Sequence, residues 1–464
     1  MKGLSLVGAD HAVRLANGRQ RRYVNLDNAA STPPLRAVLD AVTEFMPWYS
    51  SVHRGAGQKS LLSTHRYERA RETVARFVGA DLCDHVVVFG RNTTEAINKL
   101  SYRLALSADD VVVISQLEHH SNDLPWRARA RVLRIRADAQ GALDEEHAAQ
   151  LLRENAGRVR LLAVTGGSNV TGHLPPIHRL AVLAHSAGAR ILVDAAQLAP
   201  HRRIEMGALD DPAHLDYLAL SGHKMYAPFG VGALIGRRDT FERGEPEMRG
   251  GGTIRFVSTD DVAWAAAPER DEAGTPNVVG AIALAAAIDS LERVGMDAVA
   301  AHESALTAHA LRGLATVPGL RIHGDAAPSR ASQRLGVIPF EISGLGHAEL
   351  AARLAAEHAI GVRSGCFCAH PYLVHLLRLD AAQIRAAQLR LIRDDHRDTP
   401  GLTRVSFGVG NALEDVDALV AALGDIADRN VLNRSRPAPF RMLRFDRAAR
   451  KHGSDTGTVI GPMR

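Results

Sequence analysis

One lysine lies just after a predicted strand, which is a common position for the catalytic residues of α/β enzymes. Lys224 closes the tetrapeptide Ser221-Gly222-His223-Lys224, which follows an apolar run over residues 215–220 that we predict to be a buried strand. Enzymes built on α/β sheets carry their sites just outside the carboxyl ends of the strands. A lysine held there can form a Schiff base once it loses its proton. Taken by itself, the tetrapeptide favours the alternative, an ordinary solvated lysine on a surface loop.

A second group that could do chemistry is the pair of cysteines in Gly365-Cys366-Phe367-Cys368. A thiolate is both a nucleophile and a metal ligand, and the preceding glycine gives the loop conformational freedom. A metal site normally needs a further pair of ligands, and the chain has no second cysteine pair, so we predict no metal. Cys83, the third cysteine, lies near a predicted strand start and is expected to be structural.

Apolar runs and helical patterns alternate along the first part of the chain. The runs lie at residues 86–89, 111–115, 132–135, 159–164, 191–193, 215–220 and 231–235. Short apolar strands separated by helices predict an α/β fold with a large, mostly parallel, doubly wound sheet that is covered on both faces. From about residue 290 onward, long helical patterns and shorter strands predict a second, smaller α+β domain.

These patterns give four predicted regions. Residues 1–35 form an N-terminal segment that packs on the small domain, and residues 36–290 form the large cofactor-binding domain. Residues 291–428 form the small C-terminal domain, and residues 429–464 form a basic, loosely ordered tail. The tail could instead bind nucleic acid, but no nucleic-acid-binding motif accompanies its arginines, so we expect no such partner.

Composition and the N-terminus point to a cytoplasmic protein without a membrane partner. Hydrophobic residues make up 46% and charged residues 23% of the 464 residues, which is typical of a globular protein and excludes a disordered chain. Residues 1–20 lack the apolar core of a signal peptide, and no run of about 20 apolar residues could span a membrane. Three cysteines give no disulfide framework, which fits a reducing compartment.

Polar residues follow several of the predicted strands, and these strand ends should meet in one crevice. They are Thr94, His119, Asn169, Asp194, Gln197 and Lys224. Thr93 and Thr94 open a helix whose free N–H groups form a natural anion site, although a plain N-cap explains them equally well. A phosphate cup, a histidine, an aspartate and a lysine together suit pyridoxal phosphate, with the aspartate on its pyridinium nitrogen.

A series of ordered motifs along residues 25–423 then makes this pattern specific. The motifs are Asp27-Asn28-Ala29-Ala30, Val52-His53-Arg54-Gly55, Thr93-Thr94-Glu95, Glu118-His119-His120-Ser121-Asn122, Ser168-Asn169, Asp194-Ala195-Ala196-Gln197, Ser221-Gly222-His223-Lys224, Gly274-Thr275-Pro276-Asn277, residues 362–369 and Arg404-Val405-Ser406-Phe407. In this order they resemble the class V aminotransferase-fold enzymes, and specifically the cysteine desulfurases and selenocysteine lyases. The resemblance implies the fold type I architecture of pyridoxal-phosphate-dependent transferases.

The resemblance also implies a role for each matching cofactor residue. Lys224 would hold pyridoxal phosphate as a Schiff base and move protons, and His119 would stack on the ring and act in acid–base steps. Asp194 would keep the pyridine nitrogen protonated, and Gln197 would reach the ring oxygen. The phosphate would be held by Thr93, Thr94, Ser221 and His223. Thr275 would reach the phosphate of a partner subunit, which implies a homodimer.

Substrate roles follow from the same resemblance. Asn169, which is also expected to contact the cofactor, and Arg404 would hold the substrate carboxylate, with Arg363 as a further substrate-binding residue. Cys368 matches the sulfur acceptor of the family, whose thiolate takes the substrate sulfur and leaves a persulfide and alanine. Arg363 nearby could lower the pKa of this thiol.

The chain departs from the commonest family pattern at Cys366, where many members have a histidine. The Gly-Cys-Phe-Cys form resembles the molybdenum-cofactor sulfurase branch. Cys366 could relay the persulfide, protect it, or take no part. The segment at residues 376–399, rich in arginine and aspartate, could dock a partner, but we favour a solvated helix.

These observations predict a dimeric pyridoxal-phosphate enzyme that removes sulfur from L-cysteine, or selenium from selenocysteine, and releases alanine. The persulfide would pass to a sulfur-acceptor protein. One alternative is another C–S lyase, an epimerase or an aminotransferase of the same fold, with Cys368 idle. A different alternative is a non-catalytic scaffold that binds a sulfur carrier through its basic tail.

Overall fold

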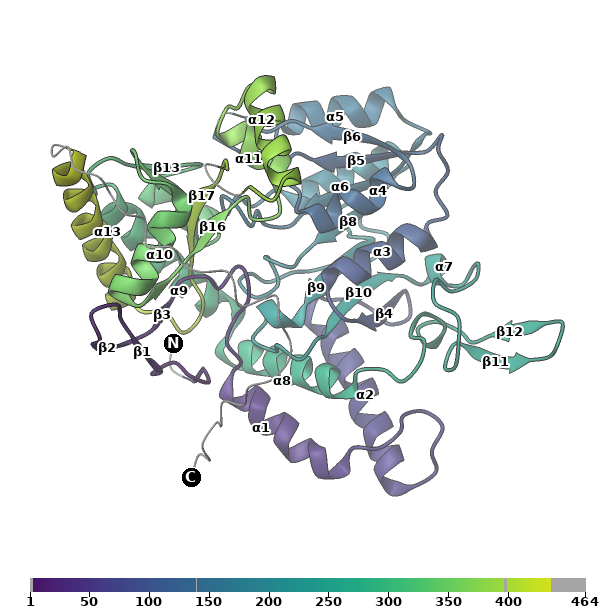
Figure 1. The fold of residues 1–464 in the computed structure, drawn as a ribbon. Coiled ribbons are helices and arrows are strands. Elements are labelled where there is room, and N and C mark those ends of the chain that lie inside the picture. The colour runs from purple at the N-terminus through teal and green to yellow at the C-terminus, as the bar shows by residue number, and fades with distance from the viewer. Residues whose placement is uncertain (1–2, 139, 396–398, 435–464) are drawn as a thin grey trace.

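Two units lie side by side in the computed structural model, which describes residues 3–138, 140–395 and 399–434 (Figure 1). The larger unit is built on a seven-stranded sheet and the smaller on a four-stranded sheet. The predicted α/β architecture, a large doubly wound sheet beside a smaller α+β unit, is confirmed. The predicted domain boundaries at residues 35, 290 and 428 stay a prediction.

The large sheet has the strand order β4-β10-β9-β8-β7-β5-β6. Strand β10 runs antiparallel to β4 and β9, and the other neighbours are parallel. A short connection joins β9 to β10, too short for the helical crossover that a parallel pair requires, so β10 returns antiparallel. The strands are β4 (His85–Gly90), β5 (Val111–Ser115), β6 (Arg131–Ile135), β7 (Val159–Thr165), β8 (Arg190–Asp194), β9 (Tyr217–Ser221) and β10 (Gly232–Arg237).

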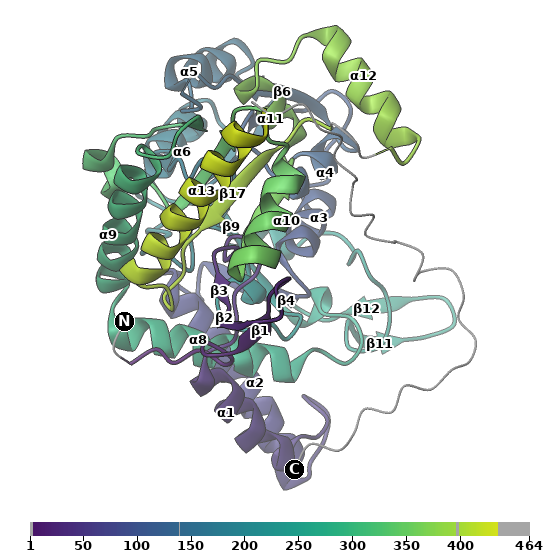
Figure 2. The same cartoon turned by 60° about the vertical axis from the view of Figure 1, so that its left-hand side comes forward.

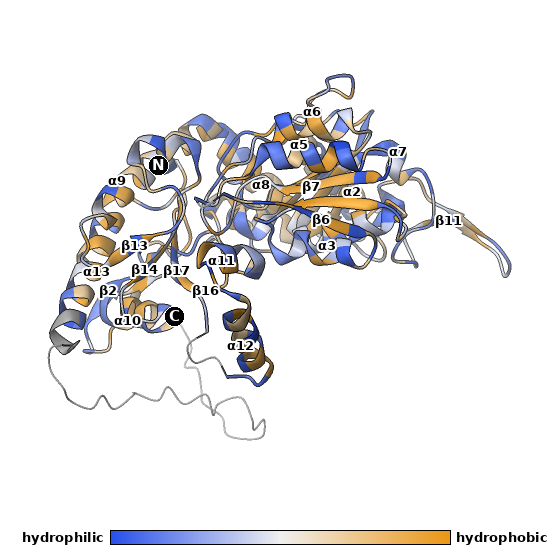
Figure 3. Ribbon diagram, turned by 90° about the horizontal axis from the view of Figure 1, so that it is seen from above, coloured by the Kyte–Doolittle hydropathy of each residue, from blue (hydrophilic) through white to orange (hydrophobic). Residues whose placement is uncertain are grey.

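Helices cover both faces of this sheet, which explains why its central strands are apolar throughout rather than alternating. Every residue of β5 and β9 is buried. One face packs on α2 (Gln58–Phe77), α5 (Glu145–Glu154), α6 (Ile177–Ser186) and α8 (Val278–Val294), and α1 (Arg36–Phe45) packs on α8. The other face packs on α3 (Thr93–Arg103), α4 (Leu124–Arg127) and α7 (Arg238–Phe241). Figure 3 shows the apolar strands enclosed between these helices.

The smaller unit carries an antiparallel sheet of order β13-β14-β17-β16. These strands are β13 (Leu320–Ile322), β14 (Val337–Ile342), β16 (Arg363–Gly365) and β17 (Leu402–Ser406). Helices α9 (Met296–Leu314), α10 (His347–His358) and α13 (Leu413–Arg434) share its apolar core (Figure 2). Helix α13 includes residues 429–434, the start of the predicted tail, and residues 435–464 lie outside the described part of the chain.

The N-terminal segment lies against the smaller unit. Strand β3 (Val24–Asn25) pairs in parallel with β15 (Ile360–Gly361), and the N–H of Ala16 donates to the carbonyl of Ala356. Two hairpins were not predicted. Strands β1 (Ala12–Arg14) and β2 (Gln20–Arg22) form one, and β11 (Ile254–Val257) and β12 (Val262–Trp264) form an arm that extends from the large unit (Figure 1).

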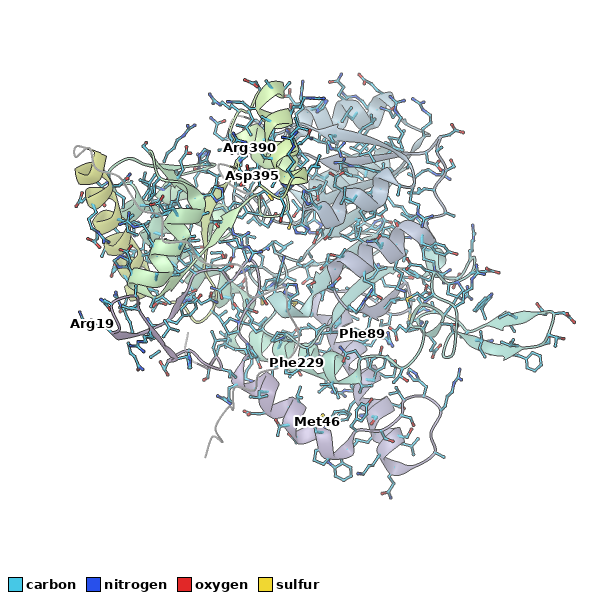
Figure 4. The ribbon with its side chains drawn as sticks, viewed as in Figure 1. Arg19, Met46, Phe89, Phe229, Arg390 and Asp395 are labelled. Atoms are coloured by element: carbon cyan, nitrogen blue, oxygen red, sulfur yellow. The ribbon has the colours of Figure 1, made fainter. Side chains whose placement is uncertain are left out.

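Several short elements complete the structure. They are α11 (His370–Leu376) and the 3-10 helices η1 (Met46–Trp48), η2 (His120–Asn122), η3 (Gly222–Lys224), η4 (Glu269–Asp271) and η5 (Pro328–Gln333). The segment at residues 376–399 contains the expected solvated helix, α12 (Ala381–Ile392), which has no buried residue. Beyond it the N–H of Asp395 donates to the carbonyl of Arg390 (Figure 4). None of the helices described is both long and apolar enough to span a membrane.

Helix α3, whose N-terminus faces the cavity described below, is fixed at its far end by a buried ion pair. The Arg103 guanidinium donates to both carboxylate oxygens of Asp271, at 2.7 and 2.8 Å, and both side chains are almost fully buried. Asp271→Ala would leave a buried, uncompensated charge. We expect urea unfolding to show a loss of about 3–5 kcal/mol in the free energy of unfolding. Glu72→Ala, which removes an exposed partner of Arg69, is the control and should cost less than about 1 kcal/mol; equal losses would contradict this role.

Candidate active site

A cavity of about 210 Å³ opens at the carboxyl ends of β7, β8 and β9, where the two units meet. Asp194 ends β8 and Ser221 ends β9, so the parallel strands deliver their terminal side chains to one place. The predicted site residues that line it are Thr93, Thr94, His119, Asn169, Asp194, Gln197, Ser221, His223, Lys224, Arg363, Cys368 and Arg404. The structure therefore brings together every predicted site residue except Thr275.

Lys224 lies on the 3-10 turn η3, directly after β9. Surrounding protein lowers the pKa of its amine to about 8, because burial disfavours the charged ammonium. The Asp194 carboxylate opposes this shift, and Arg404 adds to it. The neutral, nucleophilic amine is thus accessible near neutral pH, which an exposed lysine does not offer.

Asp194 is buried opposite this lysine. Its carboxylate accepts a hydrogen bond from the N–H of Ala196 at 3.0 Å, and burial raises its pKa. A buried acid of this kind is suited to hold a protonated ring nitrogen, whose positive charge would compensate the buried carboxylate. Gln197, one turn further on, donates to the carbonyl of Ala29 at 2.7 Å, which fixes its side chain at the cavity wall.

The N-terminus of α3 forms the polar end of the cavity. Ser221 accepts hydrogen bonds from both the N–H and the hydroxyl of Thr93, at 2.9 and 3.0 Å. The Thr94 hydroxyl lies 2.7 Å from the Ser121 hydroxyl. The positive end of the helix dipole and these hydroxyls together suit a phosphate group. His223 completes this end as a neutral ring, since burial and Lys224 lower its pKa to about 4.

His119 faces the lysine as a neutral imidazole. Burial first, and then the charges of Lys224, His120 and Arg404, lower its pKa to about 4. Its Nδ1 accepts from the N–H of Ser121 at 3.1 Å, so the ring proton lies on Nε2. A flat, neutral ring in this position can stack on an aromatic ring.

Arg404, on β17 of the smaller unit, supplies the cavity's cation. Its guanidinium donates to the carbonyl of Asn169 at 2.8 Å and to the carboxylate of Asp27 at 3.0 Å, and it lies over the Phe367 ring. Its Nε is buried and has no hydrogen-bond partner. The guanidinium lines the cavity, and its positive charge suits a carboxylate ligand. Arg363 also lines the cavity, and its guanidinium forms a longer ion pair with Asp27, at 3.8 Å.

Cys368 reaches the cavity from the loop that links β16 to α11, and its side chain is exposed. Cys366 is half-buried, packs against the core of the large unit and does not line the cavity. The two cysteines of the Cys-x-Cys pair therefore have different environments, and only Cys368 faces the groups described above.

Thr275 lies in a separate hollow on the large unit. This hollow is also lined by His53, Arg54 and the loop at Gly251 and Gly252. Thr275 does not line this chain's own cavity, and its expected role on the phosphate of a partner subunit stays a prediction.

The structure adds residues to the site that sequence reasoning did not assign. Ser121 bonds both His119 and Thr94, Phe367 packs under Arg404, and Asp27 pairs with Arg404. Glu118 is fully buried, and burial raises its pKa to about 8. It accepts from the N–H of Thr165 at 2.9 Å, which ties the His119 loop to β7. These added residues all lie within motifs recognised in the sequence, but the motifs do not reveal the contacts between them.

These groups fit pyridoxal phosphate and an amino-acid substrate. The shielded lysine suits an aldehyde carbon, the buried aspartate a pyridine nitrogen and the helix N-terminus a phosphate. The Arg404 guanidinium, which lines the cavity, suits a substrate carboxylate.

Comparisons with known proteins agree with this geometry. Residues 24–419 match the family model of the aminotransferase class-V proteins. A cysteine desulfurase of Cronobacter sakazakii is 37% identical over 422 residues, which cover 88% of this chain and 94% of that protein. A cysteine desulfurase of Haloferax volcanii is 34% identical, over 86% of this chain and 88% of its own length.

Among solved structures, the chain is similar to cysteine desulfurases. The apo cysteine desulfurase of Thermococcus onnurineus superposes with a TM-score of 0.76 at 32% identity, covering 88% of this chain and 95% of that one. The cysteine desulfurase CsdA of Escherichia coli, in its S-sulfonic acid form, gives a TM-score of 0.73 at 33% identity with the same coverage.

The lowered pKa of Lys224 can be measured directly. Reductive methylation of cofactor-free protein modifies neutral amines, so the Lys224 rate should rise with a half-point at about pH 8. Peptide mass spectrometry separates Lys224 from Lys59, an exposed reference. Asp194→Asn should move the half-point lower, because the carboxylate favours the ammonium form. A half-point near the ordinary lysine value of about 10.4 would contradict the effect of burial.

Proposed function

We propose that this chain, which belongs to the aminotransferase class-V family, is a pyridoxal-phosphate-dependent cysteine desulfurase. Its substrate would be L-cysteine or selenocysteine, and its products would be alanine and a persulfide on Cys368. The observation that carries the proposal is that Cys368, Lys224 and Arg404 line one cavity. The named desulfurases among its relatives support the same reaction.

Pyridoxal phosphate, when bound, would supply an electron sink for the electron pair of the bond that breaks. Lys224 would hold the cofactor and, once released, carry protons at Nζ. Asp194 would hold the pyridine nitrogen in its protonated form, and His119 would stack on the ring. Thr93, Thr94, Ser221 and His223 would bind the phosphate, with Gln197 at the ring oxygen.

Substrate binding would use the donors that the fold leaves available. The Arg404 guanidinium would bind the substrate carboxylate, and Asn169 would lie beside it. Asp27 already holds the other end of the guanidinium, so the arginine is oriented before the substrate arrives. Arg363, whose guanidinium lies 3.8 Å from the Asp27 carboxylate, would add positive charge to the cavity.

Sulfur transfer would then depend on Cys368. Its thiolate would form an S–S bond with the substrate sulfur while the substrate C–S bond breaks. The electron pair of that bond would stay with the carbon, which takes a proton from Lys224 Nζ and leaves as alanine. The sulfur would remain on Cys368 as a persulfide, and its exposed position would allow a sulfur-acceptor protein to collect it.

The working form would be a homodimer in the cytoplasm. Thr275 lies outside the cavity of its own chain, so contact with a phosphate would require a second subunit. The three free cysteines fit a reducing compartment.

Replacing Cys368 tests the persulfide step. Cys368→Ala should lower alanine and sulfide formation from cysteine on the order of 10³-fold or more, as expected when a covalent nucleophile is removed. Cys366→Ala is the matched control, because Cys366 does not line the cavity, and it should stay within about threefold of the parent. Unchanged alanine production by Cys368→Ala would contradict the mechanism. Absence of an absorption band near ~400 nm that depends on Lys224 would contradict the cofactor.

Replacing Thr275 tests the dimeric site. Thr275→Ala should keep the sedimentation coefficient of a dimer but raise the dissociation constant for pyridoxal phosphate roughly tenfold, as expected for one lost bond to an anion. Ser258→Ala, on the β11–β12 arm, should change neither quantity. A monomeric protein that still retains the cofactor tightly would contradict the shared site.

A further inference from the structure

The loop that carries Cys368 has an unusual backbone. Phe367 and Cys368 both adopt left-handed conformations, with φ of 54° and 56°. Residues with a side chain rarely enter this region, and two in succession require support from their surroundings. The loop also crosses between the units, because β16 belongs to the small sheet whereas Tyr372 and Leu373 of α11 pack in the core of the large unit.

The large unit supports these two residues through one hydrogen bond to each of them. The Asn169 side chain donates to the carbonyl of Phe367 at 2.7 Å, and the N–H of His120 donates to the carbonyl of Cys368 at 2.8 Å. These two bonds orient the peptide groups on either side of the Cys368 Cα. The loop is thereby attached to the same turns that carry His119 and Asn169 in the cavity.

A pair of histidine side chains closes the attachment. The N–H of His370 donates to Nε2 of His120 at 3.2 Å, and Nδ1 of His370 lies 3.2 Å from the same nitrogen. The two rings are parallel within 6°, with centroids 5.0 Å apart. Because a backbone N–H can only donate, Nε2 of His120 must present its lone pair. The contact therefore exists only while that nitrogen carries no proton.

We propose that His120 and His370 form a clamp that fixes Cys368 at the mouth of the cavity, so that both are positioning residues for sulfur transfer. The proposal rests on the proposed function for its consequence, since the step that needs positioning is the attack of the Cys368 thiolate. Neither histidine lines the cavity, so the clamp acts through the loop.

The surroundings of His120 keep its ring neutral. Burial, followed by His370, lowers its pKa below the usual range, and burial lowers the pKa of His370 as well. Asp123 acts in the opposite direction, but its carboxylate is already paired with Arg127 and Arg134. Arg127 itself disfavours a charge on His120, and a charge on His120 in turn disfavours one on His119.

The clamp should weaken as the pH falls. The clamped loop holds His120 without a proton at Nε2, whereas a released loop lets this nitrogen take one. Acid therefore favours release, and the clamp is complete above the ordinary histidine pKa of about 6.5. His120→Gln places an amide oxygen, which accepts a hydrogen bond but does not titrate, at a reach similar to that of Nε2.

The rate at which iodoacetamide alkylates Cys368 reports on the clamp and does not require catalytic turnover. The full-length protein is labelled at pH 8 and the Cys368 peptide is quantified by mass spectrometry, with exposed Cys83 as the internal reference. His120→Ala, which removes the acceptor of the His370 N–H, should raise the Cys368 rate about 2- to 10-fold, the change given by loss of an ordinary hydrogen bond. His370→Ala keeps this N–H and removes only the contacts of the His370 ring, so it should raise the rate by a smaller factor. His375→Ala, on the same helix but bonded to the carbonyl of Asp138, should not change it.

The conservative variant separates a clamp from a general loss of structure. His120→Gln should stay within about twofold of the parent at pH 8. The ratio of the parent's Cys368 rate to that of His120→Gln should then rise as the pH falls below about 6.5, because only the parent loses its acceptor. Taking the ratio removes the effect of thiol protonation, which is common to both proteins.

Kinetics supply the second readout. His370→Ala should lower kcat for alanine formation and leave KM for cysteine unchanged, since Arg404 and Asn169 are untouched. Equal Cys368 alkylation in the parent, His370→Ala and His120→Ala would overturn the clamp, as would a pH-independent ratio. If the labelling results hold but Cys368→Ala still forms alanine at the parent's rate, the clamp stands and the proposed function fails.

Discussion

Exclusion of water from Lys224 is the constraint on which the rest of the site depends. A solvated ammonium is a poor nucleophile, and the shielded amine of this chain loses its proton near pH 8. The same low-polarity surroundings keep His119 and His223 neutral and raise the pKa of Asp194. One physical effect, desolvation at the ends of the strands, therefore sets the protonation states of the whole cofactor end of the cavity.

The reactive cysteine is brought to that cavity by a different device. Arg404 and Cys368 come from the smaller unit, and their positions depend on bonds across the boundary to Asn169 and His120. The large unit thus supplies the cofactor groups, whereas the choice of reaction depends on how the crossing loop is held. This division agrees with the general rule that the residues of a site, and not the fold alone, determine the reaction.

Much of this arrangement could be predicted from the sequence, because apolar runs mark buried strands and motif residues follow strand ends. The predicted strand at residues 111–115 matches β5 at both ends, and the one at residues 159–164 ends one residue before β7 does. The two short hairpins were not predicted. In the β11–β12 hairpin, the reason is that its apolar residues are mostly exposed and do not alternate regularly with polar ones. The roles of Asp27, Phe367 and His370 depend on contacts between distant segments, which no local pattern encodes.

The central claim is that substrate sulfur moves to Cys368, and peptide mass spectrometry after a single turnover tests it most directly. The protein, loaded with pyridoxal phosphate, is mixed with one equivalent of L-cysteine, and the remaining thiols are alkylated under conditions that preserve persulfides. We expect a mass gain of about 32 Da, one sulfur atom, on the Cys368 peptide together with a matching amount of alanine. Alanine formed without that gain, or the gain found on Cys366 or Cys83 instead, would contradict the account.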